Sequence, residues 1–296
     1  MGWSGSLTAS SAVGSSITYT PDTTTSHGYS VSAFTAPRDG VFQFILKGSG
    51  GAVNGSEYDR YWTSARGSGG AGGTTVGYLN MSAGQTVYIG AGGVHSAAFV
   101  SKINISTLAA ASSASNLWFV AGAGGGGGAM WDNSHQWSNN NSAGNGASGG
   151  GSSGANAGGN GGSQTAGGSG GWNNGTFGSG GRGGYENHEG GLSDSYSTTC
   201  GDGGDGLYGG GSGSYNTGGG GGSGYIHASS LSVAHKTYAN STTQGGGAGS
   251  NTAGSVVVTY YARAELPIVY NGQTVLELHY NGQEVKSLIY NGTTVF

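Results

Sequence analysis

Charged side chains are scarce in this chain: Lys, Arg, Asp and Glu together make up 7 % of its 296 residues. The formal net charge is −4, and the nine basic residues are scattered rather than clustered. Proteins that bind nucleic acid carry a basic patch or stripe, so we expect no nucleic-acid partner. No basic amphipathic stretch is present either, which argues against binding to a membrane surface.

Cysteine, proline and long apolar runs are nearly absent as well. The single cysteine, Cys200, excludes an internal disulfide framework and a multi-cysteine zinc site. No apolar run approaches the ~18 residues of a membrane span. Residues 1–16 lack both the charged and the apolar region of a secretory signal. From these patterns we expect neither membrane insertion nor signal-directed secretion.

Glycine, by contrast, supplies 69 residues, and 42 of the 105 residues from 121 to 225 are glycine. Residues 158–184 read GGNGGSQTAGGSGGWNNGTFGSGGRGG, which falls into a GGX phase of three that recurs at 201–224. Polyproline-II geometry has three residues per turn, so bare glycine backbones pack and hydrogen-bond while the third residue points outward. With only three prolines and no strict Gly-X-Y repeat, collagen is disfavoured. We predict ordered polyglycine-II helices, with a disordered linker as the alternative.

The flanks of the glycine-rich segment carry strand signals rich in β-branched and aromatic residues. These are VFQFILK after a turn at 37–40, a strand–turn–strand unit at 72–93, NLWFVAGAGG at 116–125 and GSVVVTYYARA at 254–264. Residues 106–116 fit a short helix or a loop. Neither flank alone has enough strands to close a sandwich, so both are expected to share one core.

The predicted organisation is therefore all-β, with four parts. An N-terminal arm covers 1–28, and a discontinuous β-sandwich covers 29–128 plus 225–264. A polyglycine-II insertion with aromatic and polar loops covers 129–224. Residues 265–296 repeat Tyr-Asn-Gly every ten positions, and Asn-Gly favours the type I′ turn of a tight hairpin. This tail is predicted to be a β-meander that packs on another surface, because such small hairpins bury little core.

Several segments together resemble the glycine-rich domain of the anaplastic lymphoma kinase and leukocyte tyrosine kinase receptors, which also occurs in bacterial and phage proteins. They are PRDGVFQFILKGSGG, AGQTVYIGAGG, FVAGAGGGGG, GGGGGSGYI and GSVVVTYYA. The resemblance covers about residues 29–264 and implies a TNF-like or jelly-roll sandwich with inserted polyglycine-II helices. This chain has no cysteine pairs, membrane span or kinase domain, so no receptor function carries over.

Glycine blocks alternating with aromatic and polar loops also resemble the adhesins at the tips of phage long tail fibres. The Tyr-Asn-Gly tail is similar to repeats in tail and fibre proteins of phages and prophages of Gram-positive gut bacteria. These resemblances imply a non-enzymatic virion protein that acts extracellularly in host attachment. Its partners would be a bacterial surface glycan or outer-surface protein and other virion proteins, with a homotrimer expected from fibre precedent. A head-fibre or tail decoration protein and a bacterial surface adhesin are the alternatives.

Islands of aromatic, amide and acidic residues interrupt the glycine repeats, a mixture typical of binding loops. Aromatic faces beside Asn and Asp acceptors also suit a sugar ring. The candidate receptor-binding residues are Trp131, Asp132, His135, Trp137, Trp172, Asn174, Phe177, Tyr185, His188, Tyr196 and Tyr215, and the candidate assembly residues are Tyr270, Tyr280 and Tyr290. The competing interpretation is that these aromatics pack the glycine layers.

No catalytic constellation is predicted. Residues 167–171 match G-x-S-x-G, but a nucleophile elbow needs a preceding strand and a following helix. His188 with its neighbouring glutamates and His135 with Asp132 lack the spacing of a known metal site, and GDGGDG at 201–206 is too short for a calcium-binding repeat. We therefore expect no enzymatic activity, no cofactor and no metal.

Overall fold

The fold is described from a computed structural model. It places residues 2–22, 25–52, 65–132, 148–150, 153–189, 195–215, 217–228, 242–244, 252–263 and six short strands between 268 and 294. Nearly all regular structure in these residues is β-strand, as the sequence predicts, and the strands pair in antiparallel fashion.

The first large sheet joins the two ends of the described core. Its order is β1 (Gly2–Ser4), β2 (Ser16–Thr20), β15 (Ser255–Arg263), β4 (Gly40–Lys47), β6 (Thr74–Met81) and β14 (Thr242–Gln244). The late strand β15 lies between β2 and β4, with Val258 opposite both Ile17 and Phe44. This pairing confirms that the two flanks of the glycine-rich segment share one sheet.

The second large sheet has five strands. Its order is β13 (Tyr225–Ile226), β9 (Leu117–Ala121), β8 (Ala98–Ser101), β7 (Thr86–Gly92) and β3 (Tyr29–Thr35). Two single-turn 3₁₀ helices, η1 (Leu108–Ala111) and η2 (Ala114–Asn116), connect β8 to β9. The Thr107 side chain caps η1 by accepting a hydrogen bond from the Ala110 amide. The segment predicted as a short helix or loop therefore contains both.

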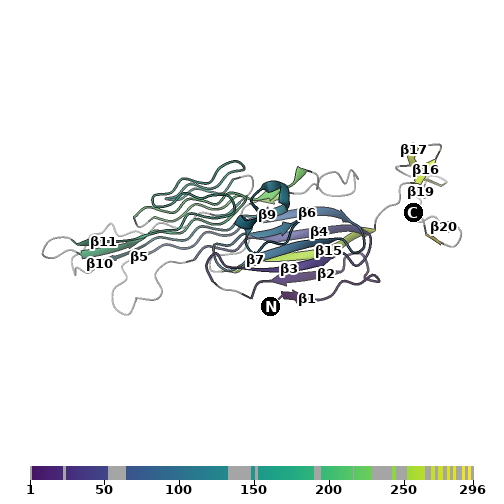
Figure 1. The fold of residues 1–296 in the computed structure, drawn as a ribbon, viewed down its shortest axis with the longest axis horizontal. Helices are drawn as coiled ribbons and strands as arrows, with labels where there is room; N and C mark the ends of the chain where they lie inside the picture. Colours follow the sequence, from purple (N-terminus) through teal and green to yellow (C-terminus); the bar gives the residue numbers. More distant parts are fainter. Residues whose placement is uncertain are drawn as a thin grey trace.

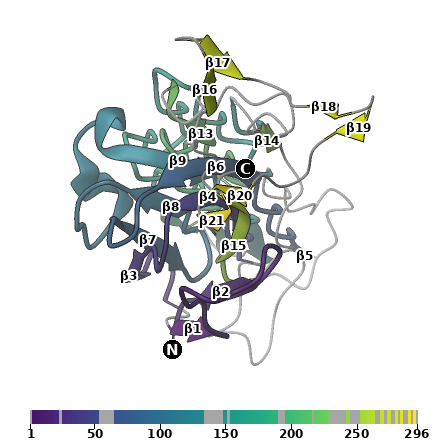
Figure 2. The same ribbon diagram turned by 90° about the vertical axis from the view of Figure 1, so that its right-hand side faces the viewer.

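The two sheets face each other across one aromatic core (Figure 2). Along β4, residues Phe42, Phe44 and Leu46 are fully buried, and the residues between them are half-buried, so this strand presents one face to the core. Phe34 of β3 packs edge-on against Phe42 and Phe44, with ring centroids 5.5 and 6.0 Å apart. Phe119 of β9 meets Phe44 at 5.9 Å. Each buried phenylalanine contributes roughly 1.5–3 kcal/mol, so these rings dominate the attraction between the sheets.

A glycine-rich body extends from one end of this sandwich, and its extended segments run side by side (Figure 1). We use this name for the described residues within 48–52, 67–73, 122–128, 148–184 and 200–224. The segments are joined by long-range backbone hydrogen bonds rather than by strand ladders. Gly48 N donates to Gly73 O (2.9 Å), and Gly73 N donates to Gly122 O (2.7 Å), so the body continues directly from β4, β6 and β9.

Deeper in the body, one series of hydrogen bonds links four segments. Gly220 N donates to Gly211 O and Gly211 N to Asn160 O, both at 2.8 Å, and Asn160 N donates to Ser169 O at 2.9 Å. A Cβ atom built on Gly220 would lie 2.1 Å from Asn160 O, and one on Gly211 would lie 2.2 Å from Ser169 O. Neighbouring backbones are therefore too close for any side chain at these positions. The high glycine content is a packing requirement of an ordered body, since a linker would not impose it.

A third sheet lies at the end of the body that is farthest from the sandwich (Figure 1). Its order is β11 (Tyr185–Glu189), β12 (Ser195–Thr199), β10 (Ala129–Asp132) and β5 (Ala65–Arg66). Beyond the sandwich, each Tyr-Asn-Gly repeat gives one hairpin. These pair β16 (Ile268–Tyr270) with β17 (Gln273–Val275), β18 (His279–Tyr280) with β19 (Gln283–Glu284) and β20 (Ile289–Tyr290) with β21 (Thr293–Thr294).

The tail thus differs from the expected meander. Among its described residues the strands form three separate two-stranded sheets, with no pairing from one repeat to the next. A strand of two or three residues has few backbone N–H and C=O groups left to pair with a second strand from the next repeat. Tyr270, Tyr280 and Tyr290 each end the first strand of a pair, opposite Gln273, Gln283 and Thr293, and the Asn-Gly residues between them lie outside the described residues.

Candidate functional site

The predicted binding residues fall into three groups in the structure. His135 and Trp137 lie outside the described residues. Trp131, Asp132, Tyr185, His188 and Tyr196 are placed by their backbone in the third sheet. Trp172, Asn174, Phe177 and Tyr215 have described side chains in the glycine-rich body.

Strand pairing gathers the second group at the far end of the body. Asp132 of β10 and His188 of β11 both stand opposite Tyr196 of β12, which lies between them. Trp131 pairs with Ser197 one position along. Asp132 and His188, which are 56 positions apart in the sequence, thus stand in one row of backbone positions across a small sheet.

Two aromatic side chains of the third group are exposed. Trp172 is 42 % exposed and Tyr215 is 59 % exposed. The backbone N–H groups of Trp172 and Asn173 both donate to Ser212 Oγ, at 3.2 and 2.9 Å. Ser212 thus lies beside Trp172, and Tyr215 follows Ser212 by three residues, which span at most ~11 Å of chain. The Trp172 and Tyr215 rings therefore belong to neighbouring segments. We call Trp172, Asn173 and Tyr215 the aromatic patch.

The backbone beneath this patch is held in place. A Cβ atom on Gly184 would lie 2.5 Å from the Trp172 indole, so the ring rests directly on bare backbone. The Cys200 thiol donates to Tyr215 O at 2.8 Å, and Tyr215 takes a left-handed φ of 49°. A left-handed, non-glycine residue is uncommon and is retained only where its surroundings determine it. The rings are therefore presented from a fixed base.

Phe177 and Asn174 have contacts typical of packing residues. Phe177 is half-buried beside the core cluster of Leu108 and Leu207, and its ring meets Tyr208 edge-on at 5.6 Å. Asn174 Oδ1 accepts the Gly170 N–H at 2.9 Å and so closes a local turn. The packing interpretation therefore fits the half-buried Phe177, whereas Asn174 is exposed and supports a local turn.

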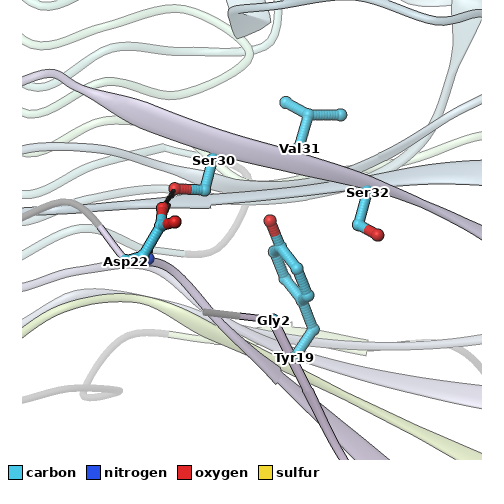
Figure 3. Close-up of a pocket in the computed structure, with 6 residues that line it drawn as sticks. All are labelled: Gly2, Tyr19, Asp22, Ser30, Val31 and Ser32. Atoms are coloured by element: carbon cyan, nitrogen blue, oxygen red, sulfur yellow. Dashed lines mark hydrogen bonds between the residues drawn. The ribbon is translucent and has the colours of Figure 1, made fainter.

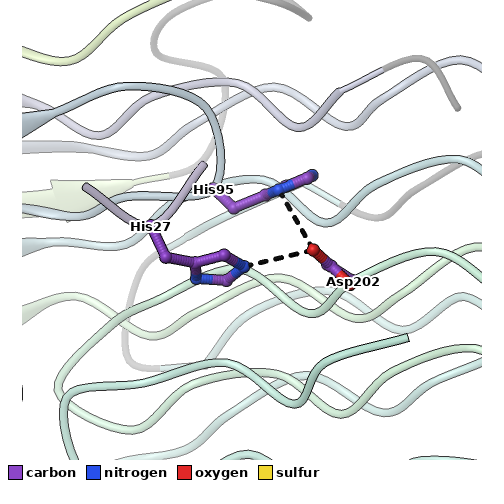
Figure 4. Close-up of side chains that lie close together, drawn as sticks. All are labelled: His27, His95 and Asp202. Atoms are coloured by element: carbon purple, nitrogen blue, oxygen red, sulfur yellow. Dashed lines mark ion pairs between the residues drawn. The ribbon is translucent and has the colours of Figure 1, made fainter. Parts of the chain in front are cut away.

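A second cluster, which the sequence did not indicate, lies where the sandwich meets the body (Figure 4). His27 precedes β3 and His95 lies between β7 and β8, whereas Asp202 and Asp205 belong to the body. His27 Nδ1 lies 2.7 Å from Asp205 Oδ1, and His27 Nε2 lies 3.4 Å from Asp202 Oδ2. His95 Nδ1 lies 3.7 Å from the same Asp202 oxygen. We call these four residues the junction cluster.

Hydrogen bonds fix the orientation of each ring and carboxylate. His95 Nε2 accepts the Ala52 N–H at 2.9 Å, which places the proton of the neutral ring on Nδ1. Asp205 Oδ2 accepts from the Tyr29 hydroxyl at 2.7 Å, and its Oδ1 accepts the Gly180 N–H at 2.8 Å. His27 Nε2 is buried and has no partner with hydrogen-bond geometry.

Burial and charge move the pKa values of this cluster in opposite directions. Burial disfavours protonation of His27, but Asp205 and Asp202 outweigh it and raise the pKa to about 9. Burial, with the charge of His27, lowers the pKa of His95 to about 4. Burial raises the pKa of Asp202, but the ion-pair contact with His27 Nε2 at 3.4 Å and the charge of the nearby histidines lower it overall. Without other ligands, a charged His27 thus faces two carboxylates and a neutral His95.

A separate open cavity of about 320 Å³ lies between β2 and β3 (Figure 3). Gly2, Tyr19, Asp22, Ser30, Val31 and Ser32 line it. The Ser30 hydroxyl donates to Asp22 Oδ1, and the Trp3 indole N–H donates to Ser32 Oγ at 3.0 Å. Burial, with the charge of Asp22, raises the pKa of Tyr19 to about 12. The cavity has the size of a small-molecule site, but Asp22, Ser30 and Ser32 already have hydrogen-bond partners within the chain.

No protein-family model matches the chain, and no curated protein matches it. Among the residues that the structure describes, no helix is long and apolar enough to cross a membrane.

Proposed function

We propose that this protein is a receptor-binding protein of a phage tail fibre or tail tip, which binds a glycan or protein on a bacterial surface. The observation that carries the proposal is the pair of exposed aromatic rings, Trp172 and Tyr215, on a backbone that hydrogen bonds hold in place. Large exposed aromatics are costly to leave in water and are enriched in binding surfaces.

We further propose that the glycine-rich body is a bundle of polyglycine-II helices and that the sandwich has the TNF-like, jelly-roll arrangement. The polyglycine-II assignment is supported by the threefold sequence phase and by hydrogen bonds from one segment to several neighbours, as at Gly211 and Gly220. Contacts closer than a Cβ atom permits support the same packing.

The physical advantage of this arrangement is pre-organisation. A flexible loop loses conformational entropy when it binds, at about 0.5–1.5 kcal/mol for each immobilised side chain. The hydrogen bonds from the Trp172 and Asn173 backbone N–H groups to Ser212 Oγ order this segment when the protein folds. Less conformational entropy is then lost when the segment binds its partner. The row of Asp132, Tyr196 and His188 in the third sheet extends the presented surface toward the far end of the body.

The experiment is adsorption of fluorescently labelled protein to a panel of bacterial strains. Once a binding strain is found, Trp172→Ala combined with Tyr215→Ala is expected to lower adsorption at least tenfold with an unchanged melting temperature. The matched control is Ile103→Ala, because Ile103 is also 42 % exposed but belongs to the sandwich. If the double variant, the Ile103→Ala control and the wild type adsorb equally, the aromatic patch is not part of the binding surface. Periodate or protease treatment of the cells separates glycan from protein receptors.

One observation favours a second role, assembly of a virion fibre. Tyr270, Tyr280 and Tyr290 lie in three separate two-stranded sheets, and an isolated hairpin of this kind is marginal in water. The tail therefore needs a partner surface, either a second copy or another virion protein. Labelled antibody against the tail, imaged on intact virions, distinguishes a tail position from a head fibre, and analytical ultracentrifugation with and without residues 265–296 measures self-association.

A further inference from the structure

We propose that His27, His95 and Asp202 form a binding site for one divalent transition-metal ion, with zinc as the best-matched metal. The site would clamp the glycine-rich body to the sandwich, and it is independent of the proposed function. Sequence analysis did not indicate this site, because His27, His95 and Asp202 are far apart in the chain.

The ligand atoms are already gathered. His27 Nε2, His95 Nδ1 and Asp202 Oδ2 all lie within 4.8 Å of one another. The two histidine nitrogens lie 3.4 and 3.7 Å from the Asp202 oxygen. With bonds of about 2.0–2.1 Å, two ligands of a tetrahedral zinc ion lie about 3.4 Å apart, so both nitrogen–oxygen separations are close to those of a loaded site. The two imidazoles need only a small approach.

The strongest independent observation is the His27 Nε2 atom. The His27 side chain is 3 % exposed, and Nε2 points at the carboxylate of Asp202 without hydrogen-bond geometry (Figure 4). A buried polar atom left without a hydrogen bond is unusual in a folded protein and calls for a cause. A metal ion between Nε2 and Asp202 Oδ2 supplies that partner.

The other side of the His27 ring is arranged as in many metal sites. Nδ1 lies 2.7 Å from Asp205 Oδ1, and Asp205 is in turn held by the Tyr29 hydroxyl and the Gly180 N–H. Metal-binding histidines usually donate their second ring N–H to a carboxylate, which orients the ring and makes the ligating nitrogen more basic. Asp205 is therefore a positioning residue for His27.

Charge and backbone conformation agree with this assignment. Asp202 and Asp205 bring two negative charges to a buried junction, and a divalent ion with two neutral imidazoles balances them. Both histidines also have left-handed φ values, 53° for His27 and 64° for His95, which non-glycine residues rarely adopt. Two imidazoles with one carboxylate favour zinc over calcium or magnesium, which prefer oxygen ligands.

Loading requires rearrangement at both ring nitrogens of His95, because Nδ1 lies 2.9 Å from the Ser26 hydroxyl. Its Nε2 now accepts the Ala52 N–H, so Nδ1 carries the ring proton. When Nδ1 binds the ion, it gives up its hydrogen bond with Ser26 Oγ and the ring is protonated on Nε2 instead, so the Ala52 amide loses that acceptor. Asp202 is 25 % exposed, which leaves a solvent route to the site and room for water as the fourth ligand.

The test uses the full chain, stripped with EDTA and dialysed. Zinc titration by calorimetry is expected to give one tight site per chain and to raise the melting temperature by several degrees, whereas calcium and magnesium leave it unchanged. Cobalt(II) is expected to give the intense visible absorption of a four-coordinate ion. Asp202→Asn, a half-exposed and nearly isosteric change, should abolish the tight site, and Asp205→Asn should weaken it by about 10–100-fold.

His227→Gln serves as the matched control, because His227 lies outside the cluster next to Lys102, and it should keep wild-type binding. His27→Gln is a further variant of the site, and because His27 is buried its result counts only if the variant folds. If it does not fold, the zinc affinity of Asp202→Asn still tests whether the site binds the metal. Equal zinc affinity in wild type and Asp202→Asn, or a cobalt spectrum typical of six-coordinate aqueous ion, would overturn the proposal.

Discussion

His27 Nδ1 lies 2.7 Å from Asp205 Oδ1, although 178 positions separate the two residues in the sequence. One belongs to the segment that leads into the sandwich and the other to the glycine-rich body. The contact therefore attaches the glycine-rich body to the sandwich through a buried ion pair. Its contribution to the free energy of unfolding can be measured by replacing either residue.

Asp205→Asn in metal-free protein is expected to lower the free energy of unfolding by about 3 kcal/mol, because it leaves His27 buried beside a neutral amide. Guanidinium denaturation followed by fluorescence measures the change. The matched control is Asp22→Asn on the exposed surface, which should stay within about 0.5 kcal/mol of wild type. A similar effect for both substitutions would mean that the junction contributes no more than an ordinary surface contact.

Tyr29→Phe tests the outer support of the same carboxylate. The Tyr29 hydroxyl donates to Asp205 Oδ2 at 2.7 Å and accepts the Ala97 N–H at 3.2 Å. Its removal leaves a buried carboxylate oxygen and an amide without partners, so we expect a loss of about 2 kcal/mol. Tyr88→Phe on β7 is a control for loss of a hydroxyl from the same sheet, since Tyr88 is only half-buried. Equal unfolding midpoints for the two variants would contradict the prediction.

Gly220→Ala tests whether the glycine-rich body is close-packed. The added Cβ atom would lie 2.1 Å from Asn160 O, so two backbones must separate, and we expect a loss of more than about 2 kcal/mol. Gly84→Ala is the informative comparison. Its Cβ meets nothing within 4 Å, but its φ is 82°, so it should lose only about 1 kcal/mol from backbone strain. If the two substitutions cost the same, close packing is not what requires Gly220.

Cys200 reports on the order of the body without any mutation. It is 2 % exposed and is the only cysteine of the chain. We expect the native protein to react with a disulfide reagent at least a hundred times more slowly than protein in denaturant, since only opening of the body exposes the thiol. Rapid labelling under native conditions would instead favour the linker interpretation.

Phe177→Ala separates packing from recognition. Phe177 is half-buried against Tyr208, so its loss should lower stability by about 2 kcal/mol and leave adsorption to the binding strain unchanged. Trp172→Ala should do the opposite, lowering adsorption with little change in stability. If a folded Phe177→Ala protein lost adsorption, Phe177 would be part of the binding surface after all.

The sequence predicted the sandwich well because its signals are local. Runs such as VFQFILK and SVVVTYY carry β-branched and aromatic residues that few other structures accommodate, and they form β4 and β15. The glycine phase likewise indicated close backbone packing, because a period of three leaves a regular set of bare positions. What the phase does not encode is which carbonyl each glycine meets, as at Gly211 and Asn160.

The candidate sites were harder to predict for a related reason. In the sequence, an aromatic residue between glycines looks the same whether its ring is exposed, as in Trp172, or half-buried, as in Phe177. The junction cluster depends on three segments that meet only in the folded chain.

The pairing of β9 with β13 has a further consequence. Tyr225 lies opposite Val120, so the polypeptide leaves the sandwich for the glycine-rich body and returns to it at adjacent strands. Adjacent exit and re-entry strands let residues 122–224 vary in length while both strands keep their place, provided that contacts with segments 48–52 and 67–73 are kept, such as the hydrogen bond from Gly73 N to Gly122 O.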